Sequence, residues 1–184
     1  MTPERITRIN YTLDVAKINK ADVVDEFGIG ENLSPTLFGW VGEELKMVCA
    51  IAPIVPKKRR FESMFMAIVA MRRGCDADAV TVISDAYFSD IGTEEPIEQR
   101  FADGDQRVTE ALLVISTEED TVMRIQPYQV QLGRKVSYGT PSIRAVSETV
   151  GYAEGFKRAL QTPRGELIDF QELQAAGISI EMTQ

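Results

Sequence analysis

Eight consecutive apolar residues, from Met64 to Met71, constrain the fold of this chain more than any other feature. The apolar residues from Phe61 to Ile68 recur at the i, i+3, i+4, i+7 spacing of one helix face. Two arginines and Gly74 follow, which is a common C-terminal signal for a helix. The pattern predicts a buried helix over about residues 60–74. Because its apolar stripe is wider than one face, this helix needs cover on several sides.

A strand is expected directly after this helix, over residues 79–88. Side chains alternate along a strand, so Val80 and Val82 share one face while Thr81 and Asp85 share the other. We therefore expect the face with the valines to join the core. The opposite face is a candidate site.

The composition is that of a folded protein with an acidic surface. Hydrophobic residues make up 44% of the 184 residues, and the formal net charge is −8. These values favour a single domain and argue against nucleic acid as a partner, because phosphate contact needs an excess of Lys and Arg. The longest apolar run is too short to span a bilayer, so no membrane contact is expected.

Histidine is absent from the chain, which excludes every His-dependent triad, acid–base pair and zinc site. The two cysteines, Cys49 and Cys75, cannot form a disulfide framework and are expected to be buried free thiols. The first residues lack an apolar signal core. Together these features predict a cytoplasmic location.

The chain divides into an N-terminal helical segment (1–30), a central part with the sheet and the buried helix (34–139), and a C-terminal helical segment (140–184). The N-terminal segment is expected to hold two helical stretches that meet near Asp14. Their apolar stripes run through Ile6 and Ile9 in the first stretch and through Ile18 in the second.

The remaining strands come from period-2 patterns bounded by turn residues. The fold class is therefore α+β, with an antiparallel sheet of five to six strands, a central buried helix and helices at both termini. Pro127 predicts an edge position or a bulge in its strand. The final ISIEM segment either adds a strand or docks on a partner. Besides 79–88, the expected strands are 36–41, 45–51, 107–116, 121–132 and 136–138.

A basic cluster stands just before the central helix, where cations oppose the helix dipole. It is interpreted either as a solvated surface turn or as an anion-binding candidate. Its members are Lys57, Lys58, Arg59 and Arg60.

Carboxylates form the first candidate site. Asp85 and Glu110 interrupt neighbouring apolar strands, and Asp90 follows the first of them. Grouped carboxylates hold Mg²⁺ or act as general acid and base. The alternative is one wet sheet face on which these acids pair with basic side chains such as Arg107, Arg124 or Lys135.

A second candidate ligand site combines hydroxyl groups with cations, because tyrosine beside arginine grips anions and stacks bases. Exposed strand positions on a covered sheet explain the same residues equally well. The members are Tyr87, Tyr128, Arg134 and Lys135, with Tyr138 nearby in the sequence.

The order of elements resembles that of small proteins from actinobacteria and their phages that have no assigned activity. The resemblance covers about Trp40 to Tyr138 and implies a shared fold and provenance, but no mechanism. The residues that carry it are Arg60-Phe61-Glu62, Arg72-Arg73-Gly74, Asp78-Ala79-Val80-Thr81 and Asp85-Ala86-Tyr87.

The leading hypothesis is a non-enzymatic binding or assembly module that acts on another protein in the cytoplasm of a bacterial host, with a phage origin as one option. It needs no cofactor. A protein partner or a homo-oligomer would supply the cover that the central helix requires. The alternative is a small metal-dependent enzyme or nucleotide-binding protein that uses the carboxylates with Mg²⁺.

Overall fold

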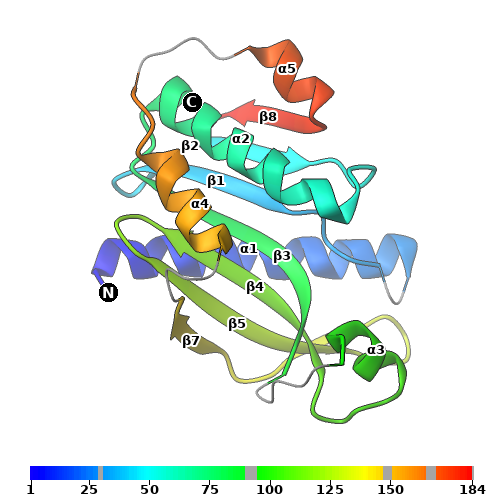
Figure 1. Ribbon diagram of the computed structural model, residues 1–184. Coiled ribbons are helices and arrows are strands. Elements are labelled where there is room, and N and C mark those ends of the chain that lie inside the picture. The colour runs from blue at the N-terminus through cyan, green and yellow to red at the C-terminus, as the bar shows by residue number, and fades with distance from the viewer. Residues whose placement is uncertain (29–30, 90–94, 147–150, 165–168, 184) are drawn as a thin grey trace.

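The computed structural model of the protein describes residues 1–28, 31–89, 95–146, 151–164 and 169–183. Within these residues eight strands form one sheet in the order β6-β5-β4-β3-β1-β2-β8, with β7 also paired to β5. Figure 1 shows the run from β5 to β8 across the sheet. Every pairing is antiparallel. The bounds are β1 Thr36–Val41, β2 Glu44–Ile51, β3 Ala79–Phe88, β4 Thr109–Thr117, β5 Thr121–Val130, β6 Val136–Tyr138, β7 Ser142–Ala145 and β8 Ile178–Met182.

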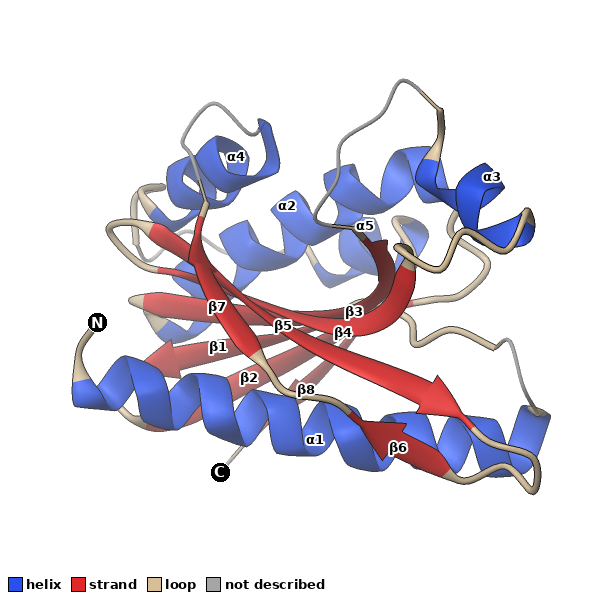
Figure 2. Ribbon diagram, turned by 90° about the horizontal axis from the view of Figure 1, so that it is seen from below, coloured by secondary structure: helices blue, strands red, loops and turns tan. Residues whose placement is uncertain are grey.

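Helices cover both faces of the sheet. The long helix α1 runs along one face, whereas α2 and α4 pack on the other (Figure 2). The short α5 lies beside α2 and β8, and α3 lies near β3. The α+β class predicted from the sequence is confirmed. The helix bounds are α1 Pro3–Phe27, α2 Lys57–Cys75, α3 Ile97–Ala102, α4 Gly151–Leu160 and α5 Phe170–Ala175.

The strand count departs from the predicted five to six. All six expected strands form, but β7 and β8 add two more within the described residues. The last segment, ISIEM, adds a strand by pairing with β2. The residues of β7 are exposed and carry no apolar alternation, which is why the pattern missed them. The C-terminal segment, which was expected to be helical, therefore also contains the strands β7 and β8.

Helix α1 is one helix of 25 residues rather than two stretches. Its buried stripe carries three cations, Arg5, Arg8 and Lys20, between small and apolar side chains such as Ala16. The predicted stripe was wrong at Ile6, which is 41% exposed, and at Ile18, which is 62% exposed. The prediction assigned the buried face of α1 from its apolar residues alone. It was wrong because the three cations are buried too, each paired with a polar group on a neighbouring element.

The core has two parts, one on each face of the sheet. Val80 and Val82 join the cluster under α2 and α4, whereas Ile83 joins the cluster under α1. The predicted alternation along β3 is thus confirmed, but its second face is also core up to Ile83. Trp40 is buried under α1 and donates its indole N–H to Thr81 Oγ1 at 3.0 Å.

Other elements of this chain pack against helix α2 and cover part of it. Met71 is fully buried, and α4 and α5 pack on the sides of the helix that the sheet leaves open. No second copy is needed to bury Ala67, Ile68, Ala70 and Met71. Four other residues of the apolar run are half-buried: Met64, Phe65, Met66 and Val69. Among the described residues, no helix combines the length and the apolarity needed to cross a membrane.

Strand β5 as a whole has partners on both sides and is not an edge strand, but Pro127 itself is paired only with β4 and so lies at a local edge. Beside β5, β7 pairs with residues 122–125 and β6 pairs with residues 128–130. Pro127 falls in the break between these two partners. Because no strand pairs with it on this side, its lack of an N–H costs no hydrogen bond of the sheet.

Gly39 sets the closest approach between α2 and the sheet. A Cβ atom at this position would lie 3.1 Å from both Cγ and Sδ of Met71, which is fully buried. The strand pairing also shifts register between Gly39 and Trp40. A glycine here lets the helix settle directly onto β1.

We expect Gly39→Ala to lower the free energy of unfolding by about 1–3 kcal/mol, because the added methyl group overpacks a closed core. Urea unfolding followed by circular dichroism measures this change. Gly139→Ala is the matched control, since its Cβ would meet Pro127 Cβ at an ordinary 3.5 Å. Equal stability of the two variants would contradict the close approach of α2 to β1.

Candidate functional site

A buried ion pair joins α1 to β3. Lys20 Nζ lies 2.9 Å from Asp85 Oδ2, and the two side chains are 1% and 3% exposed. The ammonium also donates to the Glu31 carbonyl at 2.7 Å and lies 4.7 Å from the centre of the Tyr128 ring. The backbone N–H of Leu33 donates to the same Asp85 oxygen at 2.7 Å. The other oxygen, Oδ1, is buried and has no hydrogen-bond partner.

A cleft of about 510 Å³ lies beside this ion pair. Strand β1 pairs with β3 only as far as Ile83, so the edge of β3 beyond this residue is not covered by β1. Ser84 and Ala86 face one side of the sheet and Asp85 and Tyr87 face the other, yet all four line the cleft. The cleft therefore reaches around the free edge of β3.

Acidic and hydroxyl groups from three neighbouring strands meet on one side of the cleft. Glu110 of β4 lies opposite Tyr87 of β3, and the Tyr128 hydroxyl of β5 donates to Glu110 Oε1 at 3.4 Å. Burial raises the pKa of Glu110. The Lys20 ammonium opposes this effect, the Asp85 carboxylate adds to it, and the Tyr128 hydrogen bond lowers the pKa slightly. Asp85 and Glu110 thus converge in a cleft instead of pointing to open solvent.

The tyrosines of the site are also perturbed. Burial raises the pKa of Tyr128, and the carboxylates of Asp85 and Glu110 add to this effect. Burial likewise raises the pKa of Tyr87, whose ring stacks on Phe101 with a centroid distance of 4.4 Å. Both hydroxyls therefore stay protonated at neutral pH and serve as hydrogen-bond donors.

Aromatic side chains of α2 and α4 form another wall of the cleft. Phe61 stacks on Phe156 with centroids 5.7 Å apart and planes 11° apart. A Cβ atom at Gly155 would lie 2.6 Å from Phe61 Cζ, so this glycine lets the Phe61 ring lie against α4. Tyr152 and Met64 extend the apolar lining.

The basic cluster forms the first turn of α2, where it was expected to precede the helix. Lys58 and Arg59 are exposed, and Arg59 pairs with Glu62 at 3.7 Å. Lys57 and Arg60 line the cleft. Arg60 is half-buried and donates to the carbonyls of Val55 and Pro53, at 3.1 and 3.4 Å, which closes the turn before the helix.

The second candidate set is divided by the fold. Tyr87 and Tyr128 line the cleft. Arg134 instead lies in the exposed turn before β6 and donates to the Asp25 carbonyl, and Lys135 beside it is exposed. The two cations are therefore not brought to the tyrosines.

The expected pairing of the strand acids on a wet sheet face was also wrong for Asp85, which is buried against Lys20. Arg107 pairs with Asp105, and Arg124 donates to Asn10. Asp90 lies outside the described residues.

The metal hypothesis finds limited support in these side chains. Within the described ranges no group of three Asp, Glu, His or Cys residues could hold a metal ion. Near Asp85 the Lys20 ammonium already supplies a positive charge, and a divalent cation bound there would be repelled by it. The site is therefore better suited to hydrogen-bond donors than to Mg²⁺.

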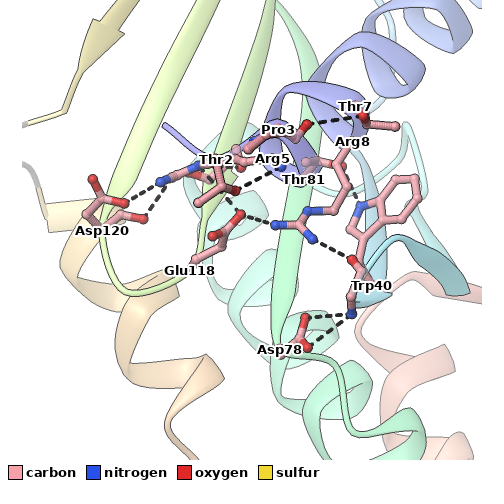
Figure 3. A network of polar contacts seen from close by, with 12 residues as sticks. Thr2, Pro3, Arg5, Thr7, Arg8, Trp40, Asp78, Thr81, Glu118 and Asp120 are labelled. Atoms are coloured by element: carbon pink, nitrogen blue, oxygen red, sulfur yellow. Dashed lines mark hydrogen bonds and ion pairs between the residues drawn. The ribbon is translucent and has the colours of Figure 1, made fainter.

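A larger hollow of about 1030 Å³ lies at the other end of α1, where ion pairs join the helix to the β4–β5 turn. Arg5 reaches Asp120 and Arg8 reaches Glu118, as Figure 3 shows. Arg5 also donates to the Ser116 hydroxyl at 3.1 Å. These contacts fasten the start of α1 to the β4–β5 turn, which is a structural role.

Sequence reasoning missed the residue that organises the cleft, Lys20. An available signal was its position in the sequence, seven residues after Leu13 and four after Ala16, which places all three on one helix face. It also missed Phe61 and Phe156 as site residues, because an aromatic side chain on a helix is normally assigned to the core.

Comparisons of the chain with family models, with curated proteins and with solved structures gave no match. The role of the cleft must therefore be inferred from its own side chains. They offer the carboxylates of Asp85, Glu98 and Glu110, protonated tyrosines and an aromatic wall. In its chemistry such a lining is complementary to a ligand that has both apolar surface and hydrogen-bond donors.

We expect Lys20→Met to lower the free energy of unfolding by about 3–5 kcal/mol, because it leaves the Asp85 carboxylate buried without its counter-charge. Replacing both partners, with Lys20→Met and Asp85→Leu, should recover most of this loss. Urea unfolding at neutral pH measures both variants. Lys17→Met, on the same helix but half-buried, should cost less than about 1 kcal/mol. Equal losses at the two lysines would contradict the role given to the ion pair.

The Glu110 carboxyl should make stability depend on pH. Because its pKa is raised in the folded chain, its protonated form stabilises the fold. This contribution is fully present below the ordinary pKa of 4.5 and is lost as the pH rises through the raised value. Glu110→Gln should therefore be more stable than the natural chain at pH 7, and the difference should close towards pH 4. Urea unfolding across this range tests it, and a difference that does not vary with pH would refute it.

Proposed function

We propose that the protein is a non-enzymatic binding module that takes a segment of another protein into the cleft at the edge of β3. The observation that carries this proposal is the convergence of apolar, aromatic and charged side chains on one open cleft of about 510 Å³. A volume of this size accommodates a few side chains of a partner. The proposal includes a cytoplasmic location, and a phage or actinobacterial origin remains part of it.

The make-up of the walls supports a protein segment as the ligand. Phe61 and Tyr152 supply the large, rigid rings that anchor protein interfaces. Glu110 supplies a hydrogen-bond acceptor, and the tyrosine hydroxyls supply hydrogen-bond donors. The edge of β3 beyond Ile83 offers backbone groups that β1 does not pair. This combination is typical of peptide recognition.

The alternative, a nucleotide-binding protein or small metal-dependent enzyme, is favoured by one observation. Lys57 and Arg60 line the same cleft as the aromatic rings, and phosphate with a stacked base needs both. The acidic side of the cleft argues against it, because Asp85 and Glu110 would repel phosphate.

We expect peptides selected from a random library on the full-length protein to bind it with micromolar dissociation constants, measured by titration calorimetry. Ser84→Phe should weaken this binding at least tenfold, because the new ring fills the cleft. Ser179→Phe makes the same change at an exposed position of β8, outside the cleft, and should leave binding intact. Circular dichroism confirms that both variants fold.

A thermal-shift panel of Mg²⁺, Mn²⁺, nucleotides and cyclic nucleotides completes the test. If nucleotides stabilise the natural chain while no selected peptide depends on Ser84, the alternative function replaces the proposed one. If Ser84→Phe fails to fold, Ala86→Leu changes a neighbouring cleft residue of β3 by a smaller volume and serves instead.

A further inference from the structure

We propose that the segment bound in the cleft carries a lysine or arginine side chain, whose positive charge is neutralised by Glu110 and Asp85. This inference rests on the proposed function, since it names the chemistry of the partner for the same cleft. The small-molecule equivalent of that side chain is a primary amine or guanidine attached to an apolar stem.

The charge balance of the cleft is the first argument. Among the described residues, Asp85 and Glu110 share one neighbouring cation, the Lys20 ammonium. Lys20 is used by Asp85 Oδ2 at 2.9 Å and by the Glu31 carbonyl at 2.7 Å. Glu110 receives only a long hydrogen bond of 3.4 Å from Tyr128. One positive charge is therefore missing when both carboxylates are ionised.

The second argument is an acceptor with no donor. Asp85 Oδ1 has no hydrogen-bond partner, although the side chain is only 3% exposed and lines the cleft. A buried carboxylate oxygen of this kind costs free energy until a donor reaches it. The Tyr128 hydroxyl lies near both carboxylates, but its single proton serves only one of them at a time. A ligand with several donors on one charged group supplies what is lacking.

The shape of the lining selects a side chain with a long apolar stem. Phe61, Met64 and Ile115 line the same cleft as the carboxylates. The methylene groups of lysine and arginine lie along apolar surface while their charged ends reach a polar partner. A bare metal ion lacks this stem and gains nothing from the apolar part of the lining.

The two cations of the cleft do not oppose this arrangement. Both Lys57 and Arg60 belong to the first turn of α2, on a different wall from the strands that carry the acids. Arg60 is held by the carbonyls of Val55 and Pro53. Lys57 is exposed, so water and salt screen its charge.

The test compares three probes that share a phenyl ring and a two-carbon chain: phenethylamine, 2-phenylethanol and 3-phenylpropionate. Each is titrated into the full-length protein and followed by backbone amide NMR shifts. We expect phenethylamine to bind about fivefold to tenfold more tightly than the alcohol, and the carboxylate to bind most weakly. Equal or weaker binding of the amine would overturn the inference.

Two charge-removing variants locate the effect. Glu110→Gln should abolish the preference for the amine over the alcohol. Glu98→Gln removes the same charge from an exposed residue of the same cleft and should retain most of the preference. If the preference survives Glu110→Gln, or is lost equally in both variants, the assignment to Glu110 is wrong.

An experiment with peptides tests whether the cleft takes the cation of a lysine or arginine side chain or only that of a free amine. In selected peptides, each lysine or arginine is replaced by norleucine, and affinity should fall about fivefold or more at one position. If peptides bind through Ser84 but no norleucine replacement matters, the inference fails while the proposed function stands. If amines show the preference but no peptide binds, the charge argument stands and the proposed function fails.

Discussion

The arrangement of this molecule depends on burying a lysine. Lys20 is 1% exposed, and a charge in that position is tolerated only because Asp85, the Glu31 carbonyl and the Tyr128 ring surround it. A shift of α1 by one turn would leave the ammonium and the carboxylate without each other. The ion pair therefore sets the position of α1 along the sheet, and the Arg5 and Arg8 contacts at the other end of the helix repeat the same constraint.

The cleft follows from this arrangement. Residues 31–35 leave α1 and cross towards β1, which they enter only at Thr36, so β3 continues past its neighbour. The same connection brings the Leu33 N–H to Asp85, which binds the loop to the ion pair. The polar side of the cleft and the docking of α1 are thus held by one set of hydrogen bonds. The buried Lys20–Asp85 ion pair thus supports the cleft from within, while the second carboxylate of the cleft, Glu110, is only half-buried.

The sequence predicted the parts of the fold that depend on simple periodicity. The central helix, six of the strands and the alternation along β3 all follow from apolar spacing. The cover of α2 by α4 and α5 and the pairing of β8 depend on contacts between distant segments, which spacing does not encode. Of the candidate site residues, Asp85, Tyr87, Glu110 and Tyr128 meet because neighbouring antiparallel strands carry them. Their shared cation was missed because a lysine is normally assigned to the surface, although Lys20 shares a helix face with Leu13 and Ala16. Arg134 and Lys135 were assigned to the site only by their closeness in sequence to Tyr138.

The contact of Phe61 with Gly155 has a consequence for how such a site can diverge. The aromatic wall is positioned by a glycine on α4, whereas the acidic side is positioned by α1 and the strands. A larger residue at 155 would push the Phe61 ring away from α4 without touching a carboxylate. Ligand size and ligand charge are therefore governed by separate parts of the chain, and related proteins could change one preference while keeping the other.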